Sequence, residues 1–184
     1  MKRMLLIIDP QIDFINGALP VPGAAKALNA LSKYILQQDG EYDCKIVTAD
    51  WHPYHHCSFK ENGGEWPMHC VQNSTGAAFF PALFKPLYTT HGTVTVLYKG
   101  TDEGAEEYSI FKNSLSAGKL RSLIRDRNIG QIDICGLAGD ICVLNTLRDG
   151  IKIYGAKTFH VLKEYAPSLD GGASLEKAIQ TLLG

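Results

Sequence analysis

Residues 131–149 read QIDICGLAGDICVLNTLRD, and this stretch decides the expected fold. Its first part, residues 131–136, is a short apolar run typical of a buried strand. The small residues that follow predict a tight turn, and residues 141–149 are expected to form a helix. A strand that turns directly into a helix is the building unit of α/β proteins.

The rest of the chain repeats this alternation of strand and helix. We expect further strands at residues 3–9, 44–48, 93–98 and 157–162, and helices at residues 24–38, 115–127 and 174–183. The stretch 51–86 is rich in aromatic residues, His, Gly and Pro, which predicts a long functional loop without regular structure. The pattern implies a single α/β domain over residues 1–184, with a parallel sheet covered by helices on both faces.

Composition narrows the class of protein. The 184 residues have a formal charge of −1, with 45% hydrophobic and 20% charged residues, so no basic surface favours nucleic acid or an anionic membrane. The apolar run near the N-terminus stops at Asp9, which makes it too short for a signal sequence, and no stretch is long enough to span a bilayer. We therefore expect a cytoplasmic protein without nucleic-acid or membrane partners.

The cysteine pattern is that of a reduced protein. The five cysteines are Cys44, Cys57, Cys70, Cys135 and Cys142. An odd number without a secretory signal argues against a disulfide framework, and no C-x-x-C pair indicates a four-thiolate zinc site. Most are expected to be small buried hydrophobic residues, and composition does not tell which one is reactive.

Polar residues gather where the expected strands end. Asp9, Asp50 and Lys99 fall at or just after such ends, and Cys142 follows the turn after another. In parallel sheets these ends meet at one edge, where ligands bind. There Asp9 could take the proton of a thiol and Lys99 could stabilise the thiolate. The plainer interpretation of Asp9 and Lys99 is an ion pair that caps two strands.

Cys142 is expected at the N-terminus of a helix. The helix dipole lowers the pKa of a thiol in that position, and free backbone N–H groups of the turn could form an oxyanion hole. Local context alone favours a different interpretation, in which Cys142 is a buried cysteine that packs on the sheet.

A histidine cluster predicts a metal site. Four of the six histidines, His52, His55, His56 and His69, lie close together after Asp50. Asp50 and His52 are two residues apart, so in an extended segment both side chains face the same side. A carboxylate with imidazoles suits zinc, iron or manganese. The alternative is a polar loop with exposed histidines.

Several segments share a pattern that covers nearly the whole chain. They are DPQIDF (9–14), TADWHP (48–53), SF (58–59), WPMHCV (66–71), KG (99–100), YSIF (108–111) and GLAGDICV (136–143). In this order they resemble the nicotinamidases, a group within the isochorismatase-like cysteine hydrolases. The WPMHCV segment together with the aspartate-x-histidine pair favours nicotinamidases over isochorismatases.

The resemblance implies the isochorismatase-like fold, a Rossmann-like three-layer α/β arrangement. It also implies hydrolysis of nicotinamide to nicotinic acid and ammonia, a step of NAD salvage, through a cysteine thioester. The implied catalytic triad is Asp9, Lys99 and Cys142. The oxyanion turn would comprise Leu137, Ala138 and Cys142, with a cis peptide bond between Leu137 and Ala138.

The resemblance further implies one divalent metal ion, zinc in the first instance, with iron or manganese as alternatives. Its ligands would be Asp50, His52 and His69, while the position of His56 ligates metal in only some members. The aromatic walls of the substrate pocket would be Phe14, Trp66 and Tyr108.

One departure from the family pattern leaves the substrate open. Ile141 stands before the nucleophile, where the family often has His or Tyr, so another small aromatic or carbamoyl amide is an alternative substrate. Outside the hydrolases, the alternative is a redox or binding protein with Cys142 as a sensor and a structural metal. Whether the chain forms a homo-oligomer is left open.

Overall fold

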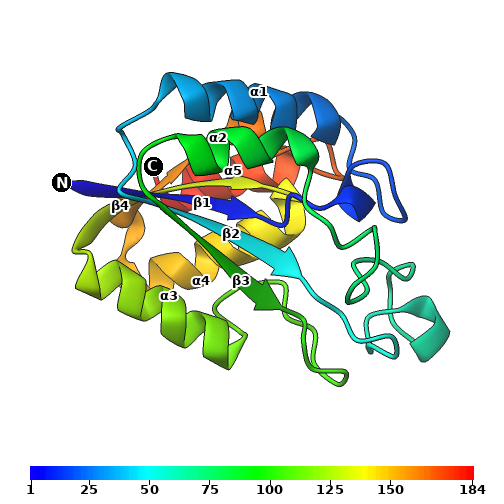
Figure 1. Cartoon of the computed structure of the whole chain (residues 1–184). Helices are drawn as coiled ribbons and strands as arrows, with labels where there is room; N and C mark the ends of the chain where they lie inside the picture. Colours follow the sequence, from blue (N-terminus) through cyan, green and yellow to red (C-terminus); the bar gives the residue numbers. More distant parts are fainter.

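A five-stranded parallel sheet forms the centre of the computed structural model, which describes residues 1–184 (Figure 1). The strands are β1 (Lys2–Ile8), β2 (Cys44–Asp50), β3 (Thr93–Lys99), β4 (Ile129–Gly136) and β5 (Phe159–Val161). Their order across the sheet is β3-β2-β1-β4-β5. The chain therefore moves outward from β1 in one direction and then from β4 in the other, which places the topological switch between β1 and β4. Ligands of such sheets bind beyond the carboxyl ends of the strands at that switch.

Helices cover both faces of the sheet, which is why its central strands are apolar along their whole length. The helices are α1 (Ala24–Gln37), α2 (Phe84–Thr89), α3 (Ser114–Asp126), α4 (Leu144–Tyr154) and α5 (Ala173–Leu182). One buried cluster joins the sheet to α1 and α2, and a second joins it to α3, α4 and α5. The expected α/β fold with helices on both faces is confirmed. None of the helices combines the length and apolar character needed to cross a membrane.

Three expected elements differ from the structure. Helix α2 lies partly inside the stretch expected to be irregular; it has six residues, too few to show helical periodicity. Strand β5 is shorter than residues 157–162, because residues 156–158 form a 3-10 turn. The helix expected over 141–149 begins only at Leu144, and the wider π-helical turn Gly139–Val143 precedes it.

The long connection from β2 to α2 packs against the carboxyl edge of the sheet despite its irregular backbone. Isolated bridges pair His52 with Val71 and Gln11 with Phe79. The Asp13 carboxylate accepts hydrogen bonds from the backbone N–H groups of Cys70, at 2.7 Å, and Ala18, at 3.0 Å. Asp13 therefore does more than cap its own segment: it fixes the stretch that carries His69.

Candidate active site

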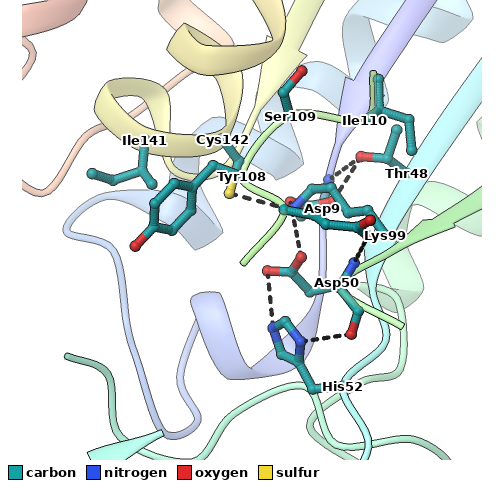
Figure 2. Close-up of polar contacts among 12 residues, drawn as sticks. Asp9, Thr48, Asp50, His52, Lys99, Tyr108, Ser109, Ile110, Ile141 and Cys142 are labelled. Atoms are coloured by element: carbon teal, nitrogen blue, oxygen red, sulfur yellow. Dashed lines mark hydrogen bonds and ion pairs between the residues drawn. The ribbon is translucent and has the colours of Figure 1, made fainter. Parts of the chain in front are cut away.

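The switch between β1 and β4 brings together the first three predicted site residues. Asp9 follows β1, Lys99 ends β3, and Cys142 lies in the turn after β4 (Figure 2). The Lys99 Nζ atom lies 2.9 Å from Asp9 Oδ2 and 3.5 Å from Cys142 Sγ. All three side chains are buried, so their charges act on one another with little screening by solvent.

Asp9 is held in an unusual backbone conformation. Its φ of 45° lies in the left-handed region, which non-glycine residues adopt at a cost. Its N–H donates to the carbonyl and the hydroxyl oxygen of Thr48, each at 3.2 Å. The Thr48 hydroxyl in turn donates to Asp9 Oδ1 at 2.6 Å. Thr48 thus fixes both the backbone and the carboxylate of Asp9, which the sequence pattern did not reveal.

Lys99 contacts a third group that the sequence analysis had not paired with it. Its ammonium also hydrogen-bonds to the carboxylate of Asp50, which is a predicted metal ligand. The parallel register explains this contact, because Asp50 and Lys99 are directly paired residues at the ends of β2 and β3. The lysine therefore links the expected nucleophile and base to the expected metal site.

The buried charges set the protonation of the cluster. Burial disfavours ionisation of Asp50, but Lys99 and then His52 outweigh it and hold the pKa of Asp50 well below its ordinary value. Burial also opposes the charge of Lys99, yet Asp50 and Asp9 raise the pKa of Lys99 well above its usual range. For Asp9 burial dominates over the opposing effect of Lys99, so the pKa of this carboxyl is raised.

The thiol of Cys142 corrects one expectation. The helix N-terminus was expected to lower its pKa, but burial raises the pKa of Cys142 well above that of a free thiol, with Asp9 adding to the rise and Lys99 opposing it. Cys142 also lies inside the π-helical turn and not at the start of a regular helix. The resting group is therefore a thiol, and it needs a base to become a nucleophile.

The turn that carries Cys142 is fixed from the far side. The peptide bond between Leu137 and Ala138 is cis, as the resemblance implied. The Asp140 carboxylate accepts from the N–H groups of Leu169 and Asp170, each at 3.0 Å. These contacts tie the turn to the segment before α5.

The predicted metal residues form a set that fits a cation. Ligand atoms of Asp50, His52 and His69 all lie within 4.8 Å of one another, and the three side chains are buried. His52 Nδ1 lies 3.0 Å from the Gly100 carbonyl and His69 Nδ1 lies 2.8 Å from the Pro67 carbonyl. Each ring thereby turns Nε2 toward Asp50 Oδ2, at 3.6 Å for His52 and 4.0 Å for His69. Metal-binding histidines show this pattern, in which one nitrogen is held by a carbonyl and the other is left for the ion.

The two adjacent histidines of the cluster behave differently. His55 is exposed, whereas His56 is buried with its ring centroid 4.0 Å from that of His52. His56 has both ring nitrogens engaged, with the Ser58 hydroxyl at 2.7 Å and the Ala105 carbonyl at 3.1 Å. The structure therefore brings together Asp50, His52 and His69 but does not direct His56 at them.

Gln11 is a buried site residue whose role the sequence analysis missed. Its amide donates to the carbonyl of Asp50 at 2.7 Å and to that of Ala77 at 3.0 Å. Its carbonyl oxygen accepts from the N–H of Asp50 at 2.8 Å. Gln11 thus aligns the end of β2, and its place within the DPQIDF segment was the signal that could have found it.

A largely apolar cavity opens beside the cluster and encloses about 370 Å³ of space. Its lining includes all three predicted wall residues together with Cys142, and the full set is Phe14, Leu19, Val21, Asp50, Trp66, His69, Glu106, Tyr108, Ala138, Ile141, Cys142 and Leu169. Trp66 Nε1 donates to the Tyr108 hydroxyl at 2.9 Å, which fixes one wall. The chamber suits a small aromatic ligand, with polar groups from Asp50 and His69 at one side and the thiol of Cys142 at another.

Comparison with known proteins gives this site its context. The isochorismatase domain matches residues 3–155. The chain belongs to the isochorismatase family. Within this family, the isochorismatase-like chain is 36% identical to a nicotinamidase/pyrazinamidase of Mycobacterium tuberculosis over 155 residues, 82% of this chain and 79% of that protein. It is 31% identical to a nicotinamidase of Escherichia coli over 169 residues, 82% of this chain and 77% of that one.

Solved structures of isochorismatase-like proteins share the fold over nearly the full chain. The pyrazinamidase of Pyrococcus horikoshii in complex with zinc has a TM-score of 0.81 at 31% identity, and the match covers 99% of this chain and 94% of that one. PnC1 from L. infantum in complex with nicotinate gives the same score and identity, with 99% and 88% covered. The predicted family and the predicted class of enzyme, an amidohydrolase of the nicotinamidase type, are confirmed.

Proposed function

We propose that this protein hydrolyses nicotinamide to nicotinic acid and ammonia, with Cys142 as the nucleophile and Asp9 as the base. The observation that carries the proposal is the buried contact of Lys99 with Asp9 and Cys142 at the wall of an aromatic-lined cavity. The relatives named nicotinamidase support the substrate. The proposal treats residues 1–184 as one hydrolase domain whose site residues all come from one chain.

The first half of the reaction begins with the proton of Cys142. Because the thiol is buried and its pKa is raised, Asp9 takes this proton as Sγ attacks the carbonyl carbon of the amide. The ammonium of Lys99, 3.5 Å from Sγ, offsets the negative charge that develops on sulfur. Backbone N–H groups of the turn at Ala138 and Cys142 stabilise the oxyanion.

Collapse of the tetrahedral species completes the acylation. The C–N bond breaks, and Asp9 gives the proton it took from Cys142 to the departing nitrogen, which leaves as ammonia. A thioester joins Cys142 to the pyridine carbonyl. Asp9, ionised again, then takes a proton from a water that attacks this thioester, and that proton returns to sulfur as nicotinic acid leaves.

The metal residues supply the orientation of the ring. The buried donor set of Asp50, His52 and His69 fits one divalent ion, and zinc, iron and manganese all suit this chemistry. A bound ion would hold the pyridine nitrogen and so fix the distance of the amide from Cys142. Gln11 keeps the backbone of Asp50 in place for this task.

Ile141 and the aromatic walls define the preference within this class. Ile141 lines the cavity next to the nucleophile and offers only an apolar surface. A flat, uncharged aromatic amide fits such a wall better than a carbamoyl substrate with further polar groups, which would lose hydrogen bonds to water there. Pyrazinamide fits the same description and is the second substrate that we expect to be cleaved.

The five free cysteines support a reducing compartment, and we propose a cytoplasmic location.

Ammonia release from nicotinamide, pyrazinamide and a carbamoyl amide tests the proposal, with metal present and after removal by a chelator. We expect Cys142→Ala to lower kcat by at least about 10³-fold without loss of folding. Chelation should remove most of the activity, and added metal should restore it. Native activity of Cys142→Ala would contradict the nucleophile, and full activity of metal-free protein would contradict the orienting role of the ion.

A further inference from the structure

The loop between β3 and α3 is closed by a single side chain. The carboxylate of Glu107 accepts a hydrogen bond from the N–H of Gly100, with Oε2 2.6 Å from the nitrogen. This contact joins the two ends of the loop, immediately after Lys99 and immediately before Tyr108. Glu107 is buried, although most of the loop it closes is exposed. A buried carboxylate that serves a backbone N–H next to the active-site lysine requires a reason.

Gly100 is the residue on which His52 rests. Its carbonyl lies 3.0 Å from His52 Nδ1, and its φ of 62° is left-handed. A Cβ atom at Gly100 would lie 2.3 Å from His52 Cε1, so the backbone touches the imidazole ring directly. Any shift of Gly100 would therefore move its carbonyl relative to the ring and release Nδ1 from the orientation that points Nε2 at Asp50.

Glu107 is itself anchored to a regular element. The Asn113 amide donates to Glu107 Oε2 at 3.0 Å and to the Thr101 hydroxyl at 3.0 Å. The Asn113 carbonyl oxygen accepts from the N–H of Ser116 at 3.1 Å and caps the start of α3. A chain of contacts thus runs from the N-terminus of α3 through Glu107 and Gly100 to the ring of His52.

We propose that Glu107 is a positioning residue that sets the metal affinity of the site by holding Gly100 against His52. This inference rests on the metal site of the proposed function and adds a residue outside the ligand set. Outer contacts that orient a metal-binding histidine typically change metal affinity by about 10- to 100-fold when removed. Because the hydrogen bond to Gly100 is made by an ionised group, its removal should give an effect in this range.

Three variants and one ligand test the proposal. The dissociation constant of Zn²⁺ is measured by competition with a chromogenic chelator for the full-length wild type, Glu107→Ala, Glu107→Gln and Glu103→Gln. Glu103 lies exposed on the same loop, so its substitution is the matched control. Far-UV circular dichroism and thermal unfolding check that each variant is folded.

We expect Glu107→Ala to bind Zn²⁺ about 10- to 100-fold more weakly. Glu107→Gln keeps an acceptor for Gly100 but not the charge, so it should recover most of the loss and stay within about 5-fold of the wild type. Glu103→Gln should match the wild type. With saturating Zn²⁺, Glu107→Ala should regain the kcat for nicotinamide, because the substitution changes occupancy of the site and not the chemistry at Cys142.

Unchanged Zn²⁺ affinity in folded Glu107→Ala would overturn the proposal, as would a kcat that stays low at saturating Zn²⁺. If Glu107→Ala does not fold, Glu107→Gln decides: an affinity lowered by about 2- to 5-fold at an unchanged Tm supports the role, and an affinity equal to that of Glu103→Gln overturns it. Wild-type protein that binds no Zn²⁺ would overturn the metal site as well. Loss of affinity in Glu107→Ala alone leaves the proposed function standing.

Discussion

Two fully buried aspartates lie on neighbouring strands and carry opposite properties. Asp133, within β4, accepts from Arg3 Nη2 at 2.5 Å, the Tyr42 hydroxyl at 2.7 Å and Gln131 Nε2 at 2.7 Å. Burial disfavours its charge, but the hydrogen bonds from Gln131 and Tyr42 and the pair with Arg3 outweigh it and lower its pKa. Asp133 is thus a satisfied anion inside the fold.

Asp9, just beyond the end of β1, has fewer partners. One oxygen accepts from the Thr48 hydroxyl and the other faces Lys99, which is shared with Asp50 and Cys142. Burial therefore prevails and the pKa of Asp9 is raised. The contrast shows how this molecule separates stability from reactivity: a carboxylate surrounded by dedicated donors holds its charge, whereas one that shares a cation can exchange a proton.

Asp9→Asn should have the largest effect on this contrast. Loss of the base should lower kcat/KM for nicotinamide by about 10²- to 10⁴-fold. Because the folded-state pKa of Asp9 is raised, its charge destabilises the fold as the pH rises above the ordinary aspartate pKa. Removal of the carboxylate should therefore leave the Tm at pH 7 unchanged or higher, as measured by thermal unfolding. A variant that unfolds at pH 7 would place Asp9 with Asp133 as a structural anion.

Asp133→Asn should show the reverse, and the effect is smaller. Three donors lose an ionised acceptor, so the free energy of unfolding should fall by about 2 to 3 kcal/mol at pH 7, with kcat/KM of the folded fraction nearly unchanged. The lowered folded-state pKa means that this stability is present above the ordinary aspartate pKa and is lost as the pH falls through the folded-state value. Urea unfolding should therefore show the variant and the wild type converging below about pH 4. A constant difference down to acid pH would contradict the charge-based explanation.

Thr48→Val should have the smallest effect and act on the proton of Asp9 alone. The Thr48 hydroxyl lowers the pKa of Asp9, so its loss should raise that pKa further. Asp9 acts in its ionised form, and the acid limb of the kcat/KM profile should therefore move upward by about one pH unit. Thr146→Val, which removes a buried hydroxyl that accepts from the N–H of Ile110, is the matched control. An acid limb at the same pH in both variants would show that Thr48 does not tune the base.

Much of the fold and part of the site could be predicted from periodicity and strand ends. The apolar runs and the alternation with helices are local properties, and they located all five strands to within a few residues. The order of polar residues along the chain also placed Asp9, Lys99 and Cys142 at one edge, since parallel strands share an edge. Helix α2 was missed because six residues are too few for a periodic signal.

The sequence by itself determined the family, the class of enzyme and the residue types of the site, because these depend on motifs that can be read along the chain. Only the tertiary structure decided which groups meet. The register of β2 and β3 pairs Lys99 with Asp50, burial raises the pKa of Cys142, and Glu107 reaches Gly100 across a closed loop. Contacts and desolvation arise when distant segments pack together, and neither is a property of any one stretch of sequence.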